Sequence, residues 1–162
     1  MNKHEAFTLT GNGLIKYILT EVAIATPISH KQSKVYKALW DTGATGSVIS
    51  NRIAQEIGLI PTGRITANGI HGSREVNTYI VDILLPSNVV IGNATVTESD
   101  NLKDFDALIG MDVICLGDFA FTNANGKSTF SFRIPSKERI DFVPETSLHN
   151  MKADGLIPNR YQ

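Results

Sequence analysis

A chain of 162 residues with a hydrophobic fraction of 42% and a charged fraction of 19% fits one folded domain and excludes a largely disordered polypeptide. Its net charge is -1 at pH 7, no basic stretch could follow a phosphate backbone, and no apolar run reaches the ~20 residues of a membrane span, so we expect no nucleic-acid and no membrane partner. The one cysteine, Cys115, cannot form an internal disulfide, which favours a reducing, cytoplasmic location.

Short runs of β-branched and aromatic residues, separated by Gly, Asn and Pro, predict a mostly β fold. The first half of the chain holds five expected strands: residues 7–10, 14–26, 34–40, 64–70 and 74–85. Residues 11–13 are the expected turn of a first hairpin. The last two strands predict a second hairpin, with a flexible glycine-rich tip at residues 69–73.

A short helix is expected between the two predicted hairpins. Ser50 has the side chain of an N-cap, residues 51–57 form the helix, and Gly58 ends it. Pro61 prevents the helix from continuing.

The second half begins with an expected strand at residues 89–97, followed by a polar loop and the buried apolar run 107–110. Residues 111–116 predict one or two helical turns. A further hairpin is expected from residues 119–122 and 128–134, in which four phenylalanines alternate as residues that face a core or an interface: Phe119, Phe121, Phe130 and Phe132. After Pro135 the chain becomes polar, and residues 145–162 predict a docked or frayed tail.

Asp41 is an acidic residue among apolar neighbours. The residues expected to be in the core lie on both sides of it: Val35, Ala38, Leu39, Trp40, Val48 and Ile49. Buried carboxylates are rare unless they are paired or functional, so a buried Asp41 is expected to have a partner or a functional role. Taken as three residues alone, Asp41, Thr42 and Gly43 are more simply an ordinary turn at the end of a strand.

The wider pattern resembles the retropepsin-like aspartic proteases. An apolar strand runs into Asp41-Thr42-Gly43-Ala44, and Leu108-Ile109-Gly110 follows at the distance at which that family has two apolar residues and a glycine. A flap-like hairpin lies between the two motifs. The resemblance covers roughly residues 14–123 and implies a closed acid-protease barrel with one or two short helices. Residues 1–135 are then the protease domain, with its C-terminal hairpin reaching residue 134, and residues 136–162 are an extension.

The resemblance implies an aspartic endopeptidase that works as a homodimer on a peptide or protein substrate. Each chain has one Asp-Thr-Gly, so the active-site pair would be Asp41 from each subunit. Thr42 would contact the equivalent loop of the partner subunit through its hydroxyl, and Gly43 would offer backbone contacts to the substrate. Neither a metal nor a cofactor is implied. The resemblance also gives substrate-binding positions: Ala44, Thr45, Gly69, Ile70, His71, Gly72, Leu108, Ile109 and Gly110.

The chain departs from many retroviral members at two positions that pair in those proteins. An acid two residues after the glycine is replaced by Thr45, and an arginine after the second glycine is replaced by Met111. The resemblance implies that Ser47 braces the loop, and we expect Asp112 to hydrogen-bond backbone near it.

The remaining candidate residues favour simpler interpretations. His71 is more simply a solvated turn histidine, and the four histidines with Cys115 have no metal-ligand spacing. Cys115 is expected to be a small core residue. Two alternatives to an active protease stay open: a binding or dimerisation module of the same fold that cleaves nothing, and a protease that its own C-terminal tail inhibits.

Overall fold

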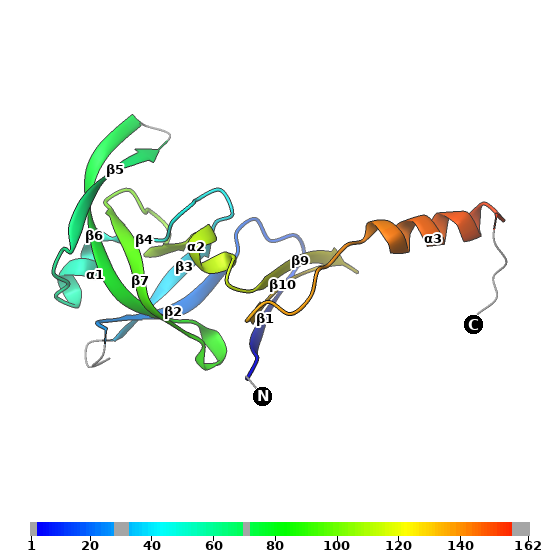
Figure 1. Cartoon of the computed structure of the whole chain (residues 1–162), viewed down its shortest axis with the longest axis horizontal. Helices are drawn as coiled ribbons and strands as arrows, with labels where there is room; N and C mark the ends of the chain where they lie inside the picture. The colour runs from blue at the N-terminus through cyan, green and yellow to red at the C-terminus, as the bar shows by residue number, and fades with distance from the viewer. Residues whose placement is uncertain (1–2, 28–32, 70–71, 157–162) are drawn as a thin grey trace.

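The computed structural model of the chain describes residues 3–27, 33–69 and 72–156, which contain two β-sheets and few helices (Figure 1). The strands are β1 Glu5–Asn12, β2 Leu19–Ala25, β3 Lys34–Trp40, β4 Val48–Ser50, β5 Gly63–Gly69, β6 Gly72–Leu84, β7 Val90–Ser99, β8 Ala107–Ile109, β9 Asp118–Ala124 and β10 Lys127–Ile134. The expected mostly β fold is confirmed.

The larger sheet has the strand order β2-β3-β8-β4-β7-β6-β5, and β2 also pairs with β6. This extra pairing closes β2, β3, β8, β4, β7 and β6 into a ring around a hydrophobic core. β5 and β6 form an antiparallel hairpin that rises above the ring (Figure 1). The predicted hairpin is thereby confirmed, with Gly69 opposite Gly72. Its tip residues 70 and 71 lie outside the described residues.

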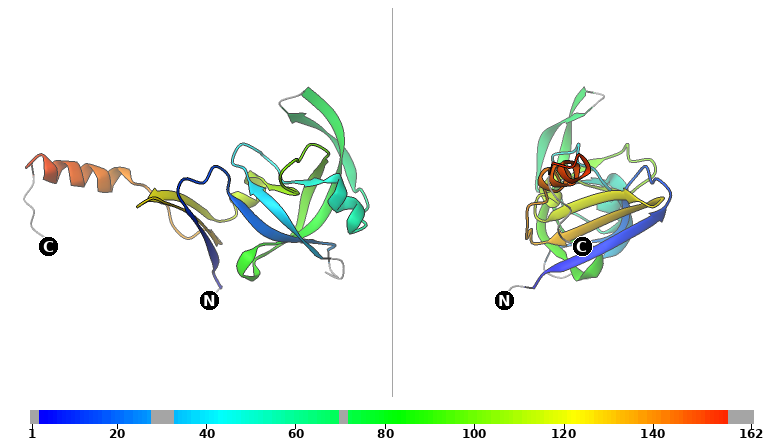
Figure 2. Two further views of the ribbon diagram at one scale, coloured as in Figure 1. Left: turned by 180° about the vertical axis from the view of Figure 1, so that it is seen from behind. Right: turned by 90° about the vertical axis from the view of Figure 1, so that its right-hand side faces the viewer.

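The smaller sheet has the order β1-β10-β9 and lies beside the ring (Figure 2). Its inner face carries a cluster of aromatic rings that joins it to the end of β3: Phe7, Trp40, Phe119, Phe130 and Phe132. The centroids of Trp40 and Phe132 are 4.9 Å apart. Trp40 immediately precedes Asp41, so this cluster also fixes the end of β3 from which Asp41 extends.

The predicted first hairpin is wrong, because β1 does not pair with β2. Instead β1 pairs along its length with β10, from Glu5 opposite Ile134 to Asn12 opposite Lys127. The expected turn residues Gly11 and Asn12 are therefore part of a strand, and residues 13–18 cross to the other sheet. Burial of Phe7 against Phe130 outweighs the local turn pattern, since partners 123 residues apart cannot be recognised from local sequence.

The hairpin of β9 and β10 is confirmed and is longer than predicted. Its two-residue turn consists of Asn125 and Gly126, both with positive φ. That geometry suits the right-handed twist of the strands, and Asn-Gly is the preferred pair for it. Of the four alternating phenylalanines, Phe130 and Phe132 are buried, whereas Phe121 is 37% exposed.

Two short helices follow strands β4 and β8 respectively. α1, Asn51–Glu56, is capped by the hydroxyl of Ser50, which accepts the N–H of Ile53 at 3.4 Å, as predicted. α2, Met111–Ile114, starts directly after Gly110. Cys115 follows α2 and is exposed, so the expectation that it belongs to the core is wrong. Val113 and Ile114 take the buried positions of this turn instead.

The C-terminal segment contains a helix that the sequence analysis missed. α3, Val143–Ala153, projects away from the two sheets, and almost all its residues are exposed (Figures 1 and 2). Asp141 accepts the N–H of Val143, Pro144 occupies the first turn, and Lys152 lies in the last turn. These are ordinary helix-end preferences that were available in the sequence. Among the described residues, none of the helices is long and apolar enough to cross a membrane.

Asp118 holds the chain where it leaves β10 towards α3. Its carboxylate forms an ion pair with Arg133 and accepts the hydroxyl of Ser136 at 2.6 Å and the N–H of Lys137 at 2.9 Å. The hydrogen bonds from Ser136, Lys137 and Arg133 lower the pKa of Asp118 below its ordinary value of 3.8. The charged form of Asp118 is therefore the one that stabilises this junction.

Asp118→Asn is expected to lower stability at neutral pH but not in strong acid. Because the pKa of Asp118 is depressed in the folded state, its stabilising effect is complete above 3.8 and declines as pH falls below that value. The measurement is the difference in Tm between the two proteins across this pH range. Asp104→Asn, at an exposed loop residue, is the control and should show no such convergence.

Candidate active site

Asp41 lies where β3 leaves the sheet. β3 pairs in parallel with β8, with Trp40 opposite Ile109. The N–H of Asp41 then donates to the carbonyl of Ile109 at 2.9 Å. On the other side, the N–H of Trp40 donates to the carbonyl of Ile18. The two motifs found in the sequence are thus adjacent in space, and the acid begins its turn from a fixed point.

The turn after Asp41 folds back on its carboxylate. The N–H of Gly43 donates to Asp41 Oδ1 at 2.8 Å, and the N–H of Ala44 donates to the Asp41 carbonyl at 3.3 Å. A Cβ on Gly43 would lie 3.1 Å from Asp41 Oδ1, so glycine allows this close approach. One carboxylate oxygen is thus oriented by backbone.

In the single chain, Asp41 is half-buried and Thr42 and Gly43 are exposed. The expectation of a buried acid is therefore wrong for one protomer. Val35, also expected in the core, is 64% exposed, because alternate residues of β3 face outward, while Ala38 and Trp40 point inward. The acid sits on a surface turn that rests on a buried strand.

Ser47 and Asp112 connect this turn to α2. The hydroxyl of Ser47 donates to Asp112 Oδ1 at 2.8 Å and accepts the N–H of Gly110 at 3.1 Å. Asp112 Oδ2 accepts the N–H of Ser47 at 2.9 Å. The expected hydrogen bond from Asp112 to backbone near the loop is confirmed. Ser47 is 2% exposed, and its hydrogen bond with the N–H of Gly110 is buried, whereas its two bonds with Asp112 are partly buried. The loop is thus held at two points.

Ser47→Ala is expected to reduce the free energy of unfolding by about 1–2 kcal/mol, because the N–H of Gly110 would lose its acceptor in a buried place. The measurement is urea unfolding of both proteins. Ser73→Ala, which removes an exposed hydroxyl bonded to Asn68, is the matched control and should change stability far less. Equal losses in the two variants would contradict the bracing role.

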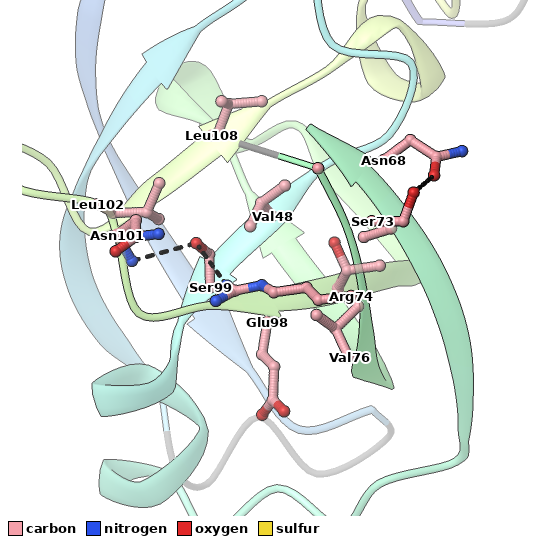
Figure 3. Close-up of a pocket in the computed structure, with 13 residues that line it drawn as sticks. Val48, Asn68, Ser73, Arg74, Val76, Glu98, Ser99, Asn101, Leu102 and Leu108 are labelled. Carbon is pink, nitrogen blue, oxygen red and sulfur yellow. Dashed lines mark hydrogen bonds between the residues drawn. The ribbon is translucent and has the colours of Figure 1, made fainter. Parts of the chain in front are cut away.

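A cavity of about 630 Å³ lies between the β5–β6 hairpin and the ring (Figure 3). We call it the hairpin cavity. Its described lining residues are Val48, Ala67, Asn68, Gly72, Ser73, Arg74, Val76, Thr97, Glu98, Ser99, Asn101, Leu102 and Leu108. Asp41 is not among them, but Val48 and Leu108 belong to the strands that hold the Asp41 turn.

Of the predicted substrate-binding residues, Gly72 and Leu108 line the hairpin cavity, and Gly69 is at the end of β5. Ile70 and His71 lie outside the described residues. Ala44 and Thr45 are in the Asp41 turn, where their carbonyls accept the N–H groups of Met111 and Asp112. Ile109 and Gly110 are buried behind that turn, because the side chains of β8 alternate between cavity and core.

The far side of the hairpin cavity, which was not predicted from the sequence, consists of Arg74, the end of β7 and the loop that follows β7. The sequence offers no local signal for these residues, since they meet only after β7 pairs with both β4 and β6. In the described part of the chain, no group of three or more His, Cys, Asp or Glu residues could hold a metal ion.

Three solved structures illustrate the similarity of this fold to known ones. A retropepsin-like aspartic protease from Rickettsia conorii has a TM-score of 0.53 and 12% identity, with 83% of this chain and 98% of that chain covered. The EIAV protease in complex with an inhibitor has a TM-score of 0.48 and 20% identity over 62% and 88%. The retroviral protease-like domain of Ddi1 from Leishmania major has a TM-score of 0.43 and 21% identity over 68% and 91%. The first of these supports the fold.

No curated protein matches the chain significantly. The family model described as gag-polyprotein putative aspartyl protease matches residues 29–115, which include Asp41, the β5–β6 hairpin, β8 and α2. This match covers more than half of the sequence and both motifs that meet at the candidate active site. The chain therefore belongs to the gag-polyprotein putative aspartyl protease family and has a retropepsin-like fold.

Proposed function

We propose that the protein is a homodimeric aspartic endopeptidase whose active site forms when the Asp41 turns of two chains meet. The observation that carries this proposal is the Asp41 turn itself. It presents a carboxylate at the surface, oriented by the N–H of Gly43 and braced from behind by Ser47 and Asp112. A surface loop held this firmly suits a group that must act in a defined position.

The single Asp-Thr-Gly of the chain supports the dimer. Hydrolysis of a peptide needs a base to activate water and an acid to protonate the carbonyl, and one carboxyl cannot do both at once. Two carboxyls close together share one proton, as is known for the pairs of aspartic proteases. Thr42 and Gly43 are exposed in one chain, so they are free to contact a second copy.

The reaction then proceeds without a covalent intermediate. The ionised Asp41 takes a proton from water, whose oxygen attacks the carbonyl carbon of the peptide. The protonated Asp41 of the other chain gives its proton to the carbonyl oxygen, which produces a tetrahedral diol. Collapse of the diol breaks the C–N bond: the now protonated carboxyl gives its proton to the departing amine, and the other carboxylate takes a proton from one diol hydroxyl, which restores the pair with one shared proton. The β5–β6 hairpin would cover an extended substrate and exclude water.

The two alternatives make different demands on these residues. A binding module of this fold would not need the oriented carboxylate of Asp41. Inhibition by the tail would require the C-terminal segment to reach the site, whereas α3 projects away from the β5–β6 hairpin in this conformation (Figure 1). Both observations favour an uninhibited peptidase.

Incubation of the purified protein with a peptide library, from acidic to neutral pH and over a serial dilution, tests the proposal. We expect defined cleavage products and a specific activity that falls on dilution, because the active site needs two chains. Light scattering on the same samples gives the oligomeric state. A protein that dimerises and cuts nothing at any pH would contradict the peptidase. Activity that is independent of dilution in a monomer would contradict the shared site.

A further inference from the structure

The hairpin cavity combines an apolar wall with one cationic side chain. Val48, Leu108, Val76 and Leu102 contribute apolar side chains to its lining. Arg74 extends from β6 across the cavity towards Ser99 (Figure 3). A side chain that entered here would meet both methyl groups and a guanidinium.

Arg74 is held by exposed partners and keeps hydrogen-bonding capacity. Its Nη1 donates to Asp100 Oδ1 at 2.6 Å, and its Nη2 donates to Ser99 Oγ at the long distance of 3.4 Å. A guanidinium has five N–H donors in a fork that fits a carboxylate. The side chain of Asp100 is 59% exposed, so water already competes with this ion pair and a second anion could share or replace it.

The other charged group of the cavity lining faces away from Arg74. Glu98 accepts the backbone N–H and side-chain amide of Asn77 on one carboxylate oxygen, and the Tyr79 hydroxyl at 2.7 Å on the other. Figure 3 shows its carboxylate directed away from the cavity. The lining therefore offers an incoming side chain a positive charge that Glu98 does not neutralise.

We propose that Arg74 is a specificity-determining residue that selects peptides with an acidic side chain, glutamate above all, in the hairpin cavity. The CH₂ groups of glutamate would lie on Val48 and Leu108, and its carboxylate would bind the guanidinium fork. This inference rests on the proposed peptidase function and adds the class of substrate that the site accepts.

The test uses peptides derived from the best library product. Glu, Gln or Leu stands at the position where the choice of residue changes kcat/KM differently in the wild-type protein and in Arg74→Leu. We expect kcat/KM for the Glu peptide to exceed that for the Leu peptide by about tenfold in the wild-type protein. Arg74→Leu should reverse this order, and Arg74→Lys should retain part of it. Asp100→Asn should increase the preference for Glu over Gln, because it removes the competing carboxylate.

Arg64→Leu is the matched control, since Arg64 lies on the same hairpin but donates to Asn77 and does not line the cavity. It should leave the Glu-to-Leu ratio unchanged. A ratio that is the same in wild type and Arg74→Leu, or that Arg64→Leu changes equally, overturns the inference while the peptidase stands.

Fluorescence anisotropy of labelled Glu and Leu peptides with the Asp41→Asn chain, with and without Arg74→Leu, gives a reading independent of cleavage. Tighter binding of the Glu peptide that is lost with Arg74 supports the inference. Equal binding of both peptides overturns it. An absence of cleavage by the wild-type protein would count against the peptidase alone.

Discussion

Asp41→Asn is expected to abolish peptide hydrolysis, with a loss of roughly 100- to 10,000-fold or more in kcat. Asparagine has nearly the shape of aspartate and its amide oxygen can still accept the N–H of Gly43, so the turn should persist. It cannot take a proton from water or share one with a partner. The measurement is kcat on a peptide that the wild-type protein cleaves.

The fold and the dimer must survive for this result to have meaning. Unfolding and light scattering of Asp41→Asn should match the wild type closely. Asp104→Asn removes a carboxylate from an exposed loop and should leave kcat unchanged. If Asp41→Asn cut peptides as fast as the wild type, the carboxylate would have no catalytic role and the proposed function would be lost.

Gly110→Ala is expected to lower the free energy of unfolding by about 3 kcal/mol or more. A Cβ at this position would lie 2.6 Å from both the carbonyl carbon and the carbonyl oxygen of Gly46, and 3.1 Å from the carbonyl of Ala44. These are backbone atoms that cannot rotate away. Either the Asp41 turn or α2 must move, so activity should fall together with stability.

The adjacent Gly46→Ala provides a sharp comparison, because a Cβ there has no atom within 4 Å. Gly46 and Gly110 lie on opposite sides of the same contact, yet a methyl group is expected to be destabilising only at Gly110. Chemical unfolding measures stability, and peptide cleavage measures the loop. Similar stability for both variants would show that the contact between Gly110 and the Asp41 turn is not tightly packed.

Local sequence was a good guide where a pattern repeats over a few residues. Ser50 as a helix cap, the β5–β6 hairpin and the turn at Asn125 and Gly126 were all predictable from propensities that act within about ten residues. The pairing of β1 was not predictable, because its partner is the far end of the chain. A glycine-rich stretch between two predicted strands indicates a hairpin, and only the folded structure shows the aromatic cluster that favours the pairing of β1 with β10.

The candidate site divides in the same way. The resemblance to retropepsin-like proteases implied that the Leu108–Gly110 motif lies behind Asp41, and Ser47 and Asp112 were expected as neighbours of the loop. The hydrogen bond between their side chains was not expected, because it depends on the distance between a turn and a helix 65 residues away. Arg74 had no local signal in the sequence, since its proposed role in specificity depends on its place in the lining of the hairpin cavity.

The sequence by itself pointed to Asp41 as the residue that would carry the chemistry of the proposed peptidase, and its single Asp-Thr-Gly led to the proposal that a second copy completes the site. Asp41 with its small-residue turn is a local pattern, and the number of such patterns in a chain can be counted. Tertiary structure alone decided how exposed that acid is, what holds its turn, and what charge lines the hairpin cavity. These properties depend on distances between strands that are remote in sequence, and such distances exist only once the ring has closed.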